Sequence, residues 1–387
     1  MKTPFQGTRP RVGIVGISGY GKIHLQLIQE QEAKGALEFA AAVVINPRDE
    51  AAVVGTLRER GTTIYATFDE MLAAEAGRLD LCLIPTGIAW HARMTIAGLE
   101  AGMNVLVEKP LAGSLAEVDA IIDASTRSGR FVAVGFQDIY NPIVRTVKLR
   151  LLAGDLGRLR SIKFLGFWPR SSAYFTRNNW VGRLRADGVA VLDSPLNNAF
   201  AHFVNLSLYF AGTSPEGFAQ AHDVRGVFWR TNAIESFDTA VVQAVTENDV
   251  HLWLGASHAS ALEREPEIVV QGEYGQLTWR HEKECLIETS ALHERLLLPQ
   301  AEETRRMMMQ AVLDRLTGRP ATLCTPEMAR HHTALVTAIH ESAVITAAPG
   351  RVERIALADG NHFILQVNGI EQRLQSAFVT GELPSQN

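Results

Sequence analysis

Short apolar runs alternate with amphipathic stretches along the first third of the chain. The apolar runs are typical of strands buried on both faces, and the stretches between them repeat apolar residues at the spacing of one helix face. The predicted strands are 11–16, 39–45, 79–84, 104–107 and 131–134, and the clearest predicted helices are 89–100 and 115–125. This alternation is typical of a parallel sheet with helices on both faces.

Beyond residue 158 the pattern changes. A strand-like run at 159–167 is followed, from about residue 217, by extended segments with no helical pattern between them. These segments are 239–245, 251–254, 267–270 and 277–279. Their order predicts an antiparallel or mixed sheet. Because 387 residues exceed one ordinary core, we expect two domains, 1–138 and 139–387.

A glycine-rich turn directly follows the first strand. Residues 17–21 lead from Gly16 into a helical pattern, and glycines at such a junction let the backbone approach a pyrophosphate at the helix N-terminus. Ser18 replaces the middle glycine of G-x-G-x-x-G, but the strand, turn and helix still predict a dinucleotide site. The predicted phosphate-binding residues are Gly16, Ser18, Gly19, Tyr20 and Gly21. The predicted fold is therefore α/β, with an N-terminal Rossmann-type doubly wound parallel sheet and a C-terminal α+β domain that contains a large, mostly antiparallel sheet.

The end of the second predicted strand bears on the choice of cofactor. It carries no carboxylate for an adenosine ribose and continues as Asn46-Pro47-Arg48. Asn46 can hydrogen-bond a ribose, and Arg48 can meet a 2′-phosphate. We therefore expect NAD(P) with a slight preference for NADP, although Arg48 on a solvated turn is an equally good interpretation.

The strand at 104–107 ends abruptly in Glu108-Lys109-Pro110. Ligands of an open parallel sheet bind outside the carboxyl ends of its strands, so a lysine at this point is directed toward the ligand. Pro110 also restricts Lys109 to extended geometry. A solvated lysine in an ordinary strand-to-loop turn is the alternative.

A polar face is predicted on a helix in the second domain. Ser194 as N-cap and Pro195 at the first helical position predict its start. Asn198, His202 and Asn205 follow at i, i+4 and i+7, so they share one face of an otherwise apolar helix. Buried polar side chains need partners or a ligand, which makes these three residues and the preceding Asp193 candidates for a substrate site.

The loop at 168–188 is dense in aromatic residues and hydrogen-bond donors. Trp168, Arg177 and Trp180 are its main candidates for contact with a polyhydroxylated or carboxylated ligand. The alternative is a solvated surface loop anchored by one tryptophan.

Charge and cysteine content narrow the class of partner. A net charge of -5 gives no reason to expect nucleic acid or an anionic membrane. No apolar run has the length of a membrane span and the N-terminus has no apolar leader, so we expect a cytoplasmic protein. Three separated cysteines predict neither a disulfide framework nor a metal site.

These motifs resemble the Gfo/Idh/MocA family, the NAD(P)-dependent glucose-fructose oxidoreductase and inositol dehydrogenase group. The matching segments are 13–24, 86–91, 101–110, 134–137, 141–142 and 154–157. The resemblance implies that Lys109 contacts the substrate hydroxyl beside the nicotinamide and that His202 is the catalytic histidine. It also implies further cofactor contacts from Thr86, His91, Glu108 and Gln137, and a homodimer or homotetramer formed through the C-terminal sheet.

The sequence departs from the family pattern most clearly at Asn198, where the family places an aspartate four residues before the histidine. Asp193 is the nearest carboxylate, so either residue is a candidate to support His202. The favoured function is an NAD(P)-dependent oxidoreductase acting on a secondary alcohol of a sugar, sugar acid or cyclitol. A glycosidase-like or lyase-like enzyme that recycles its cofactor, and a non-catalytic dinucleotide-binding sensor or assembly protein, are the alternatives.

Overall fold

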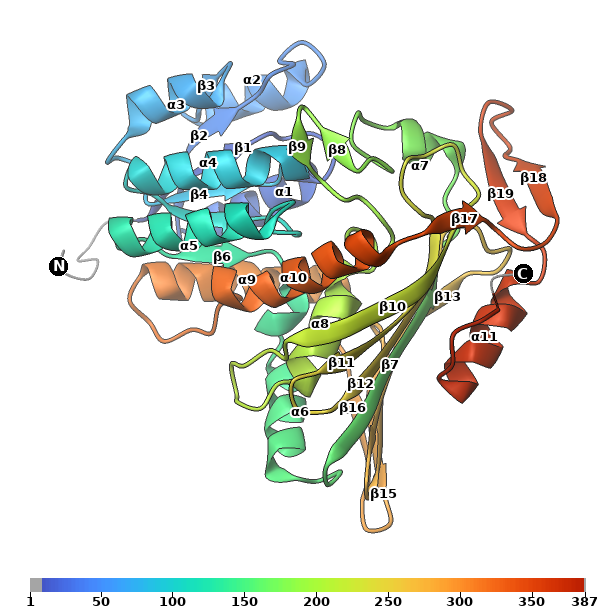
Figure 1. The fold of residues 1–387 in the computed structure, drawn as a ribbon. Coiled ribbons are helices and arrows are strands. Elements are labelled where there is room, and N and C mark those ends of the chain that lie inside the picture. The colour runs from blue at the N-terminus through green and yellow to red at the C-terminus, as the bar shows by residue number, and fades with distance from the viewer. Residues whose placement is uncertain (1–8, 386–387) are drawn as a thin grey trace. The chain divides into compact units, whose positions relative to one another are not determined.

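The computed structural model describes residues 9–385, and the chain forms two compact units (Figure 1). The first unit extends to Asn141 and also includes Glu302–Ala329; the second contains Pro142–Ala301 and the chain from Arg330 onward. The predicted boundary after residue 138 stays a prediction. No sequence pattern had indicated that 302–329 joins the first unit.

The first unit is built on a six-stranded sheet in the order β3-β2-β1-β4-β5-β6, with every pairing parallel. Its strands are β1 Arg11–Val15, β2 Glu38–Val43, β3 Thr63–Tyr65, β4 Leu81–Ile84, β5 Asn104–Val107 and β6 Val132–Val134. Its helices are α1 Gly21–Ala33, α2 Ala51–Glu59, α3 Phe68–Glu75, α4 Ile88–Glu100, α5 Leu115–Ser128, the 3-10 helix η1 Gln137–Tyr140 and nearly all of α9 Ala301–Leu316. This strand order confirms the predicted Rossmann-type sheet.

Local signals explain why these elements form. The central strands β4 and β5 are buried at every position, as expected for strands covered on both faces. Ser114 caps α5 by accepting the Glu117 N–H at 3.3 Å, and Gly129 ends the helix at φ +63°. Strand β3 escaped prediction because it has only three residues, all partly exposed.

The second unit contains a nine-stranded sheet in the order β16-β15-β14-β13-β7-β12-β11-β10-β17. Only the β7–β12 and β10–β17 pairings are parallel, which confirms the predicted mostly antiparallel sheet. Its strands are β7 Leu159–Phe167, β10 Ala221–Arg230, β11 Thr239–Thr246, β12 His251–Ser257, β13 Arg264–Gly272, β14 Gly275–Arg280, β15 Glu284–Thr289, β16 His293–Leu297 and β17 Ile345–Ala347. Two small hairpins pair β8 Arg185–Ala186 with β9 Val189–Ala190, and β18 Val352–Ala356 with β19 Phe363–Val367.

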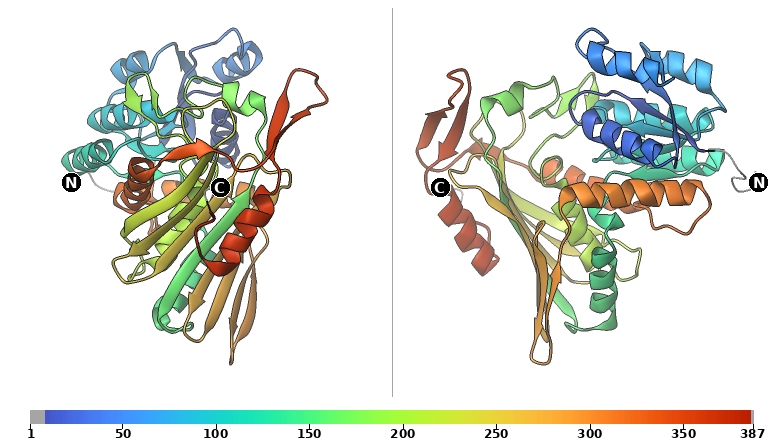
Figure 2. Two further views of the ribbon diagram at one scale, coloured as in Figure 1. Left: turned by 45° about the vertical axis from the view of Figure 1, so that its right-hand side comes forward. Right: turned by 180° about the vertical axis from the view of Figure 1, so that it is seen from behind.

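Helices lie on both faces of this sheet (Figure 2). They are α6 Pro142–Ala153, α8 Ala201–Ala211 and α11 Ile370–Thr380. The short helix α7 Ser172–Thr176 lies beside β19 instead, and α10 Pro326–Ser342 begins in the first unit and ends in the second. Neighbouring residues of β7 show the two faces: Phe164 stacks on Phe203 of α8, whereas Leu165 lies in the cluster with Leu374 and Phe378 of α11. This alternation follows from the two-residue period of a strand.

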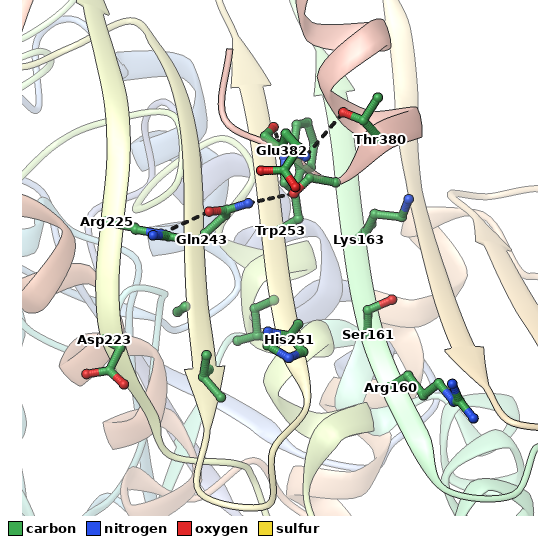
Figure 3. Close-up of a pocket in the computed structure, with 14 residues that line it drawn as sticks. Arg160, Ser161, Lys163, Asp223, Arg225, Gln243, His251, Trp253, Thr380 and Glu382 are labelled. Carbon is green, nitrogen blue, oxygen red and sulfur yellow. Dashed lines mark hydrogen bonds between the residues drawn. The ribbon is translucent and has the colours of Figure 1, made fainter. Parts of the chain in front are cut away.

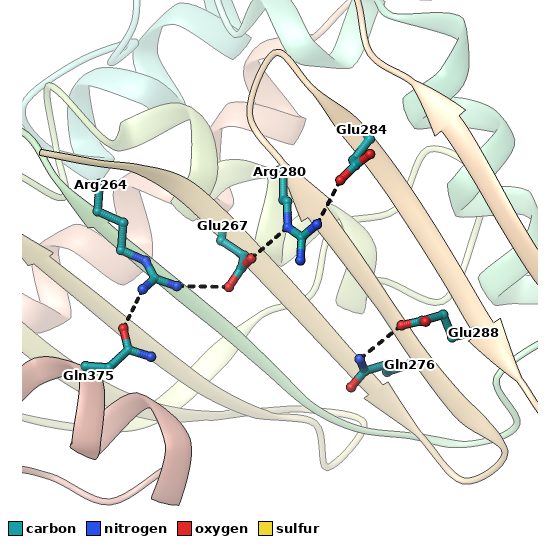
Figure 4. A network of polar contacts seen from close by, with 7 residues as sticks. All are labelled: Arg264, Glu267, Gln276, Arg280, Glu284, Glu288 and Gln375. Carbon is teal, nitrogen blue, oxygen red and sulfur yellow. Dashed lines mark hydrogen bonds and ion pairs between the residues drawn. The ribbon is translucent and has the colours of Figure 1, made fainter.

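A polar network ties α11 to the outer strands of the same sheet (Figure 4). Arg264 donates to Gln375 of α11 and to Glu267 of its own strand. Arg280 then joins Glu267 at 3.1 Å to Glu284 at 2.7 Å. These partly exposed ion pairs each add little stability, and they link the side chains of β13, β14 and β15 to α11 in a continuous network.

Candidate functional site

The predicted phosphate-binding turn in the first unit requires its glycines. Gly16 and Gly19 have φ of +90° and +53°, a conformation that L side chains rarely adopt. A Cβ at Gly21 would lie 2.4 Å from the Gly16 carbonyl oxygen, so α1 can begin at this position only with glycine. No atom lies within 4 Å of a Cβ built at Gly16 or Gly19, and the turn is therefore open on its outer side.

This open turn offers backbone donors. Ser18, Gly19 and Tyr20 are exposed, and their N–H groups are bonded to no acceptor in the described part of the chain. The N–H groups of Gly21 and Ile23, in contrast, close the turn on Ser18 and Tyr20 at 2.9 and 3.0 Å. The arrangement fits the pyrophosphate of a dinucleotide at the N-terminus of α1.

Helix α9 brings a cation to this turn that the sequence did not indicate. Tyr20 is exposed as a residue, but its hydroxyl end is buried, and burial and the charge of Glu108 raise the pKa of this hydroxyl. A hydrogen bond and the charge from Arg305 oppose that rise. On the next residue of α9, Arg306 pairs with Glu30 of α1 at 2.9 Å. Only the packing of α9 on α1 could reveal Arg305 as a site residue.

Glu108 is an anchor within the first unit. It is 6% exposed, and its Oε1 lies 2.8 Å from Nε2 of the buried His24, while Oε2 accepts the Lys109 N–H at 3.1 Å. A Cβ at Gly135 would come within 2.6 Å of Glu108 Oε1, so glycine there makes room for the carboxylate. Burial raises the pKa of Glu108, but the His24 hydrogen bond and charge and the Lys109 charge outweigh it, and the pKa is lowered.

Lys109 is half-buried at the end of β5, and the peptide bond that joins it to Pro110 is cis. His91 is buried beside this turn, with Nδ1 2.7 Å from the Pro110 carbonyl and Nε2 2.9 Å from the Thr86 carbonyl. Burial lowers the pKa of His91, although both carbonyls favour its protonated form. His91 therefore links the backbone after Lys109 to the backbone at Thr86 and stabilises the turn that carries Lys109.

The remaining predicted cofactor contacts differ in exposure. Asn46 and Arg48 are exposed on the turn after β2, where a ligand can reach them. Gln137 is 6% exposed in η1, and Thr86 is half-buried with its hydroxyl 3.9 Å from the Met94 sulfur. Their roles stay predictions.

The predicted helix start at Ser194 is wrong. Residues 195–200 form turns, and α8 begins at Ala201. Asn197 donates its side-chain amide to the Val191 and Leu192 carbonyls at 3.0 and 3.1 Å, and such local bonds compete with a helix. Asn198 consequently lies before the helix and shares no helical face with His202 and Asn205.

The turns instead bring Asn198 to Asp193. Asn198 Nδ2 donates to Asp193 Oδ1 at 2.9 Å and lies 3.3 Å from the Tyr174 hydroxyl. Asp193, which is 4% exposed, also accepts the Gly182 N–H at 2.6 Å. Burial and the Asp193 charge raise the pKa of Tyr174 to about 12, so its hydroxyl stays protonated at neutral pH.

His202 and Asn205 both lie on α8 but differ in access. His202 is half-buried, whereas Asn205 is 1% exposed and its side-chain amide forms no hydrogen bond with any described residue. Direct contact with a substrate is therefore open to His202 and closed to Asn205 in this conformation.

Aromatic rings line the neighbouring part of the second unit. Trp168 stacks on Phe200 at 4.6 Å between ring centroids, and Phe200 stacks on His258 at 5.5 Å. His258 is buried, with Nδ1 2.8 Å from the Trp168 carbonyl, and burial lowers its pKa to about 3. The sequence analysis missed this neutral histidine, although its place directly after the apolar strand β12 was a usable signal.

Arg177 lies between Tyr174 and Trp180, 4.1 and 5.8 Å from the two ring centroids.

A cavity lies elsewhere, between the outer sheet face and the end of α11 (Figure 3). Its volume is about 570 Å³, and its lining includes Arg160, Arg225, Gln243 and Glu382 but none of the predicted site residues.

In residues 9–385 no helix is long and apolar enough to cross a membrane, and no cluster of three metal-ligating side chains occurs.

Comparison with known proteins supports the interpretation of the first unit. Residues 10–136 match a family model described as "Oxidoreductase family, NAD-binding Rossmann fold". The chain is 27% identical over 241 residues to D-xylose 1-dehydrogenase (NADP(+)) 2 of Haloferax volcanii, covering 60% of this chain and 67% of that protein. It is 26% identical over 230 residues to inositol 2-dehydrogenase of Azotobacter vinelandii, covering 57% and 63%. The matches thus span about two thirds or less of these relatives.

Solved structures share the fold over most of the chain. The WlbA dehydrogenase of Bordetella pertussis in complex with NADH and UDP-GlcNAcA has a TM-score of 0.73 at 20% identity, covering 94% of this chain and all of that one. Levoglucosan dehydrogenase in complex with NADH and levoglucosan has a TM-score of 0.72 at 17% identity, covering 87% and 97%.

Proposed function

We propose that this chain is a member of the Gfo/Idh/MocA oxidoreductase family, whose NAD-binding model residues 10–136 match, and that it transfers a hydride between NAD(P) and a secondary alcohol of a sugar, sugar acid or cyclitol. The observation that carries the proposal is the open turn at 16–21: it exposes backbone N–H groups, Gly16 and Gly19 have positive φ, and a Cβ at Gly21 would clash with the Gly16 carbonyl oxygen. Distant relatives named as xylose and inositol dehydrogenases support the substrate class.

The first unit would hold the cofactor. Gly16, Ser18, Gly19, Tyr20 and Gly21 would bind the pyrophosphate, and Arg305 would add a positive charge beside them. Asn46 would bind the ribose, and Arg48 would favour a 2′-phosphate and hence NADP. When bound, the nicotinamide supplies the hydride acceptor or donor. Thr86 after β4, His91 in α4, Glu108 after β5 and Gln137 in η1 would shape the cofactor site.

Two side chains would act on the substrate. His202 would accept the hydroxyl proton as general base, and Lys109 would hold the oxygen as negative charge develops on it. An ammonium about 4 Å from that charge contributes on the order of 4 kcal/mol at an effective dielectric of about 20, or roughly a thousandfold in rate. Glu108 would position Lys109 through its backbone N–H.

Other residues of the second unit would orient the sugar ring. Asn198 and Asp193 form a hydrogen-bonded pair, and Trp168, Arg177 and Trp180 offer stacking surface and donors. Asn205 is buried, so it would support the residues that contact the sugar rather than contact the sugar itself. We further propose a cytoplasmic homodimer or homotetramer that associates through the nine-stranded sheet.

A substrate panel tests the proposal. Sugars, sugar acids and cyclitols are assayed by nicotinamide absorbance with both NAD and NADP, and we expect turnover with at least one class. Binding of the dinucleotide without turnover across the panel would favour a sensor or assembly protein. Sugar cleavage without added NAD(P), with cofactor retained on the purified protein, would favour a cofactor-recycling glycosidase or lyase.

A further inference from the structure

Two arginines share one aromatic ring in the second unit. Both guanidinium carbons approach the Tyr174 ring, Arg177 at 4.1 Å and Arg170 at 4.9 Å from its centroid. Each also approaches one tryptophan, Arg170 that of Trp168 at 5.5 Å and Arg177 that of Trp180 at 5.8 Å. The short helix α7 and its flanks therefore gather two positive charges against a single phenol.

Neither guanidinium lies within ion-pair distance of a carboxylate in the described part of the chain. Arg170 Nε is buried without an acceptor, and Glu263 acts on Arg170 only through its charge. Burial lowers the pKa of Arg170; Tyr174 and Glu263 oppose that shift, and the like charge of Arg177 adds to it. The Asp193 carboxylate of the same candidate site already accepts hydrogen bonds from the Gly182 N–H and the Asn198 side-chain amide. An added anion would relieve this repulsion.

The arginine-bearing segment is held from two sides. Ser171 forms a bridge with Ile364 of β19, and the Phe363 N–H donates to the Ser172 hydroxyl at 3.2 Å. On the other side, Asn198 lies within hydrogen-bond distance of the Tyr174 hydroxyl at 3.3 Å. The C-terminal hairpin and the turns before α8 thus hold the backbone of α7 and the Tyr174 hydroxyl, so the ring against which both guanidinium groups lie is already in place when a ligand binds.

We propose that Arg170 and Arg177 form a subsite for the oxyanion of an acidic sugar. This inference rests on the proposed function and narrows its substrate class. Guanidinium groups bind planar carboxylates through paired hydrogen bonds, which suits the carboxylate of a uronic or aldonic acid, and they bind phosphate esters by the same chemistry. The ring hydroxyls of the same ligand would then face the adjoining Trp168 and Asn198.

Matched substrates test the subsite. We would compare glucose, glucuronate and glucose 6-phosphate, and the corresponding galactose series, in wild type and in Arg170→Gln and Arg177→Gln. We expect at least a tenfold higher kcat/KM for one acidic form than for the neutral sugar in wild type, and a ratio below threefold in both variants. The acid or the phosphate that shows the higher value identifies the oxyanion.

A matched control is Arg354→Gln, because Arg354 also stacks on an aromatic ring, that of Phe363 at 4.0 Å, but lies on β18. It should keep the wild-type ratio. Equal use of neutral and acidic sugars, or an unchanged ratio in both variants, would overturn the subsite and leave the proposed function standing. If no sugar is turned over, the proposed function fails, and NMR titration of glucuronate into wild type and Arg177→Gln still decides whether the arginines bind an oxyanion.

Discussion

Asn198 donates its side-chain amide to the Asp193 carboxylate at 2.9 Å, so the residue that stands where the family resemblance predicts an aspartate is bonded to a carboxylate from five residues upstream. The pair keeps one negative charge at this point of the second unit. Two carboxylates at the same distance would repel, and one of them would be forced to take up a proton.

Replacement of Asn198 by aspartate should therefore destabilise the protein. A carboxyl group whose pKa is raised on folding contributes stability below its ordinary pKa and loses it as pH rises. We expect Asn198→Asp to lower the free energy of unfolding by about 1–3 kcal/mol at pH 7, with a smaller deficit near pH 4. Urea denaturation at both pH values measures this. Asn178→Asp is the control, because Asn178 is exposed and only accepts hydrogen bonds through its side-chain oxygen.

Gly21→Ala should weaken dinucleotide binding. Its Cβ would lie 2.4 Å from the Gly16 carbonyl oxygen, so the turn at 16–21 must open or shift. We expect at least a tenfold rise in the Kd for NAD(P), measured by fluorescence titration. Gly55→Ala in α2 has no atom within 4 Å of the new Cβ and should leave the Kd unchanged while stabilising the helix by about 1 kcal/mol. Equal Kd values in the two variants would contradict the assigned role of the turn.

The buried pair of Glu108 and His24 predicts a pH-dependent contribution to stability. The folded pKa of Glu108 is lowered, so its contribution is complete above the ordinary value of 4.5 and is lost as pH falls through the lowered value. Glu108→Gln should cost about 2–3 kcal/mol at pH 7, and the difference from wild type should shrink below pH 4.5. Denaturation from pH 3.5 to 8 checks this. Glu100→Gln, which removes an exposed ion pair of 3.9 Å, should cost less than about 0.5 kcal/mol.

Lys148 predicts a pH dependence of stability in the alkaline range, where Glu108 predicts one in the acid range. Its buried ammonium donates to the carbonyls of Tyr209 and Gly212 at the end of α8 and of Gly217 in the following loop, and burial lowers its pKa to about 7. Between that value and the ordinary 10.5 the unfolded chain binds one more proton than the folded one, so stability should rise with pH.

Relative to Lys148→Met, the wild-type free energy of unfolding should therefore increase by at most about 1.4 kcal/mol per pH unit over this range. Parallel denaturation curves at pH 7, 8 and 9 give the difference directly. A difference that is constant with pH would show that Lys148 keeps its proton, held by the three carbonyl acceptors.

Lys109→Ala should separate chemistry from cofactor binding. Loss of the ammonium at the developing alkoxide should lower kcat by about 10³-fold, while the Kd for NAD(P) stays within about threefold of the wild-type value. Steady-state rates with the best substrate of the panel and fluorescence titration give the two quantities. Lys283→Ala, at an exposed turn between β14 and β15, should change neither. Retained turnover in Lys109→Ala would refute the proposed mechanism.

The sequence alone determined the features whose causes are local. Apolar runs of strand length, the glycine turn at 16–21 and the polar end of β5 at Lys109 are each set within a few residues, so the Rossmann-type sheet and the place of the cofactor turn could be predicted. The mostly antiparallel second sheet followed in the same way, although β10 was missed because polar residues interrupt its first half.

The tertiary structure decided what depends on contacts between distant or competing groups. The capping signal at Ser194 lost to side-chain bonds from Asn197 and Asn198, which the local pattern could not weigh, and α8 begins at Ala201. Arg305 reaches Tyr20 because α9 packs on α1, and this pairing crosses a long stretch of chain that no periodicity in the sequence records. Arg170, Tyr174 and Arg177, in contrast, follow one another at i, i+4 and i+7, so their spacing is visible in the sequence and only their ring contacts needed the tertiary structure.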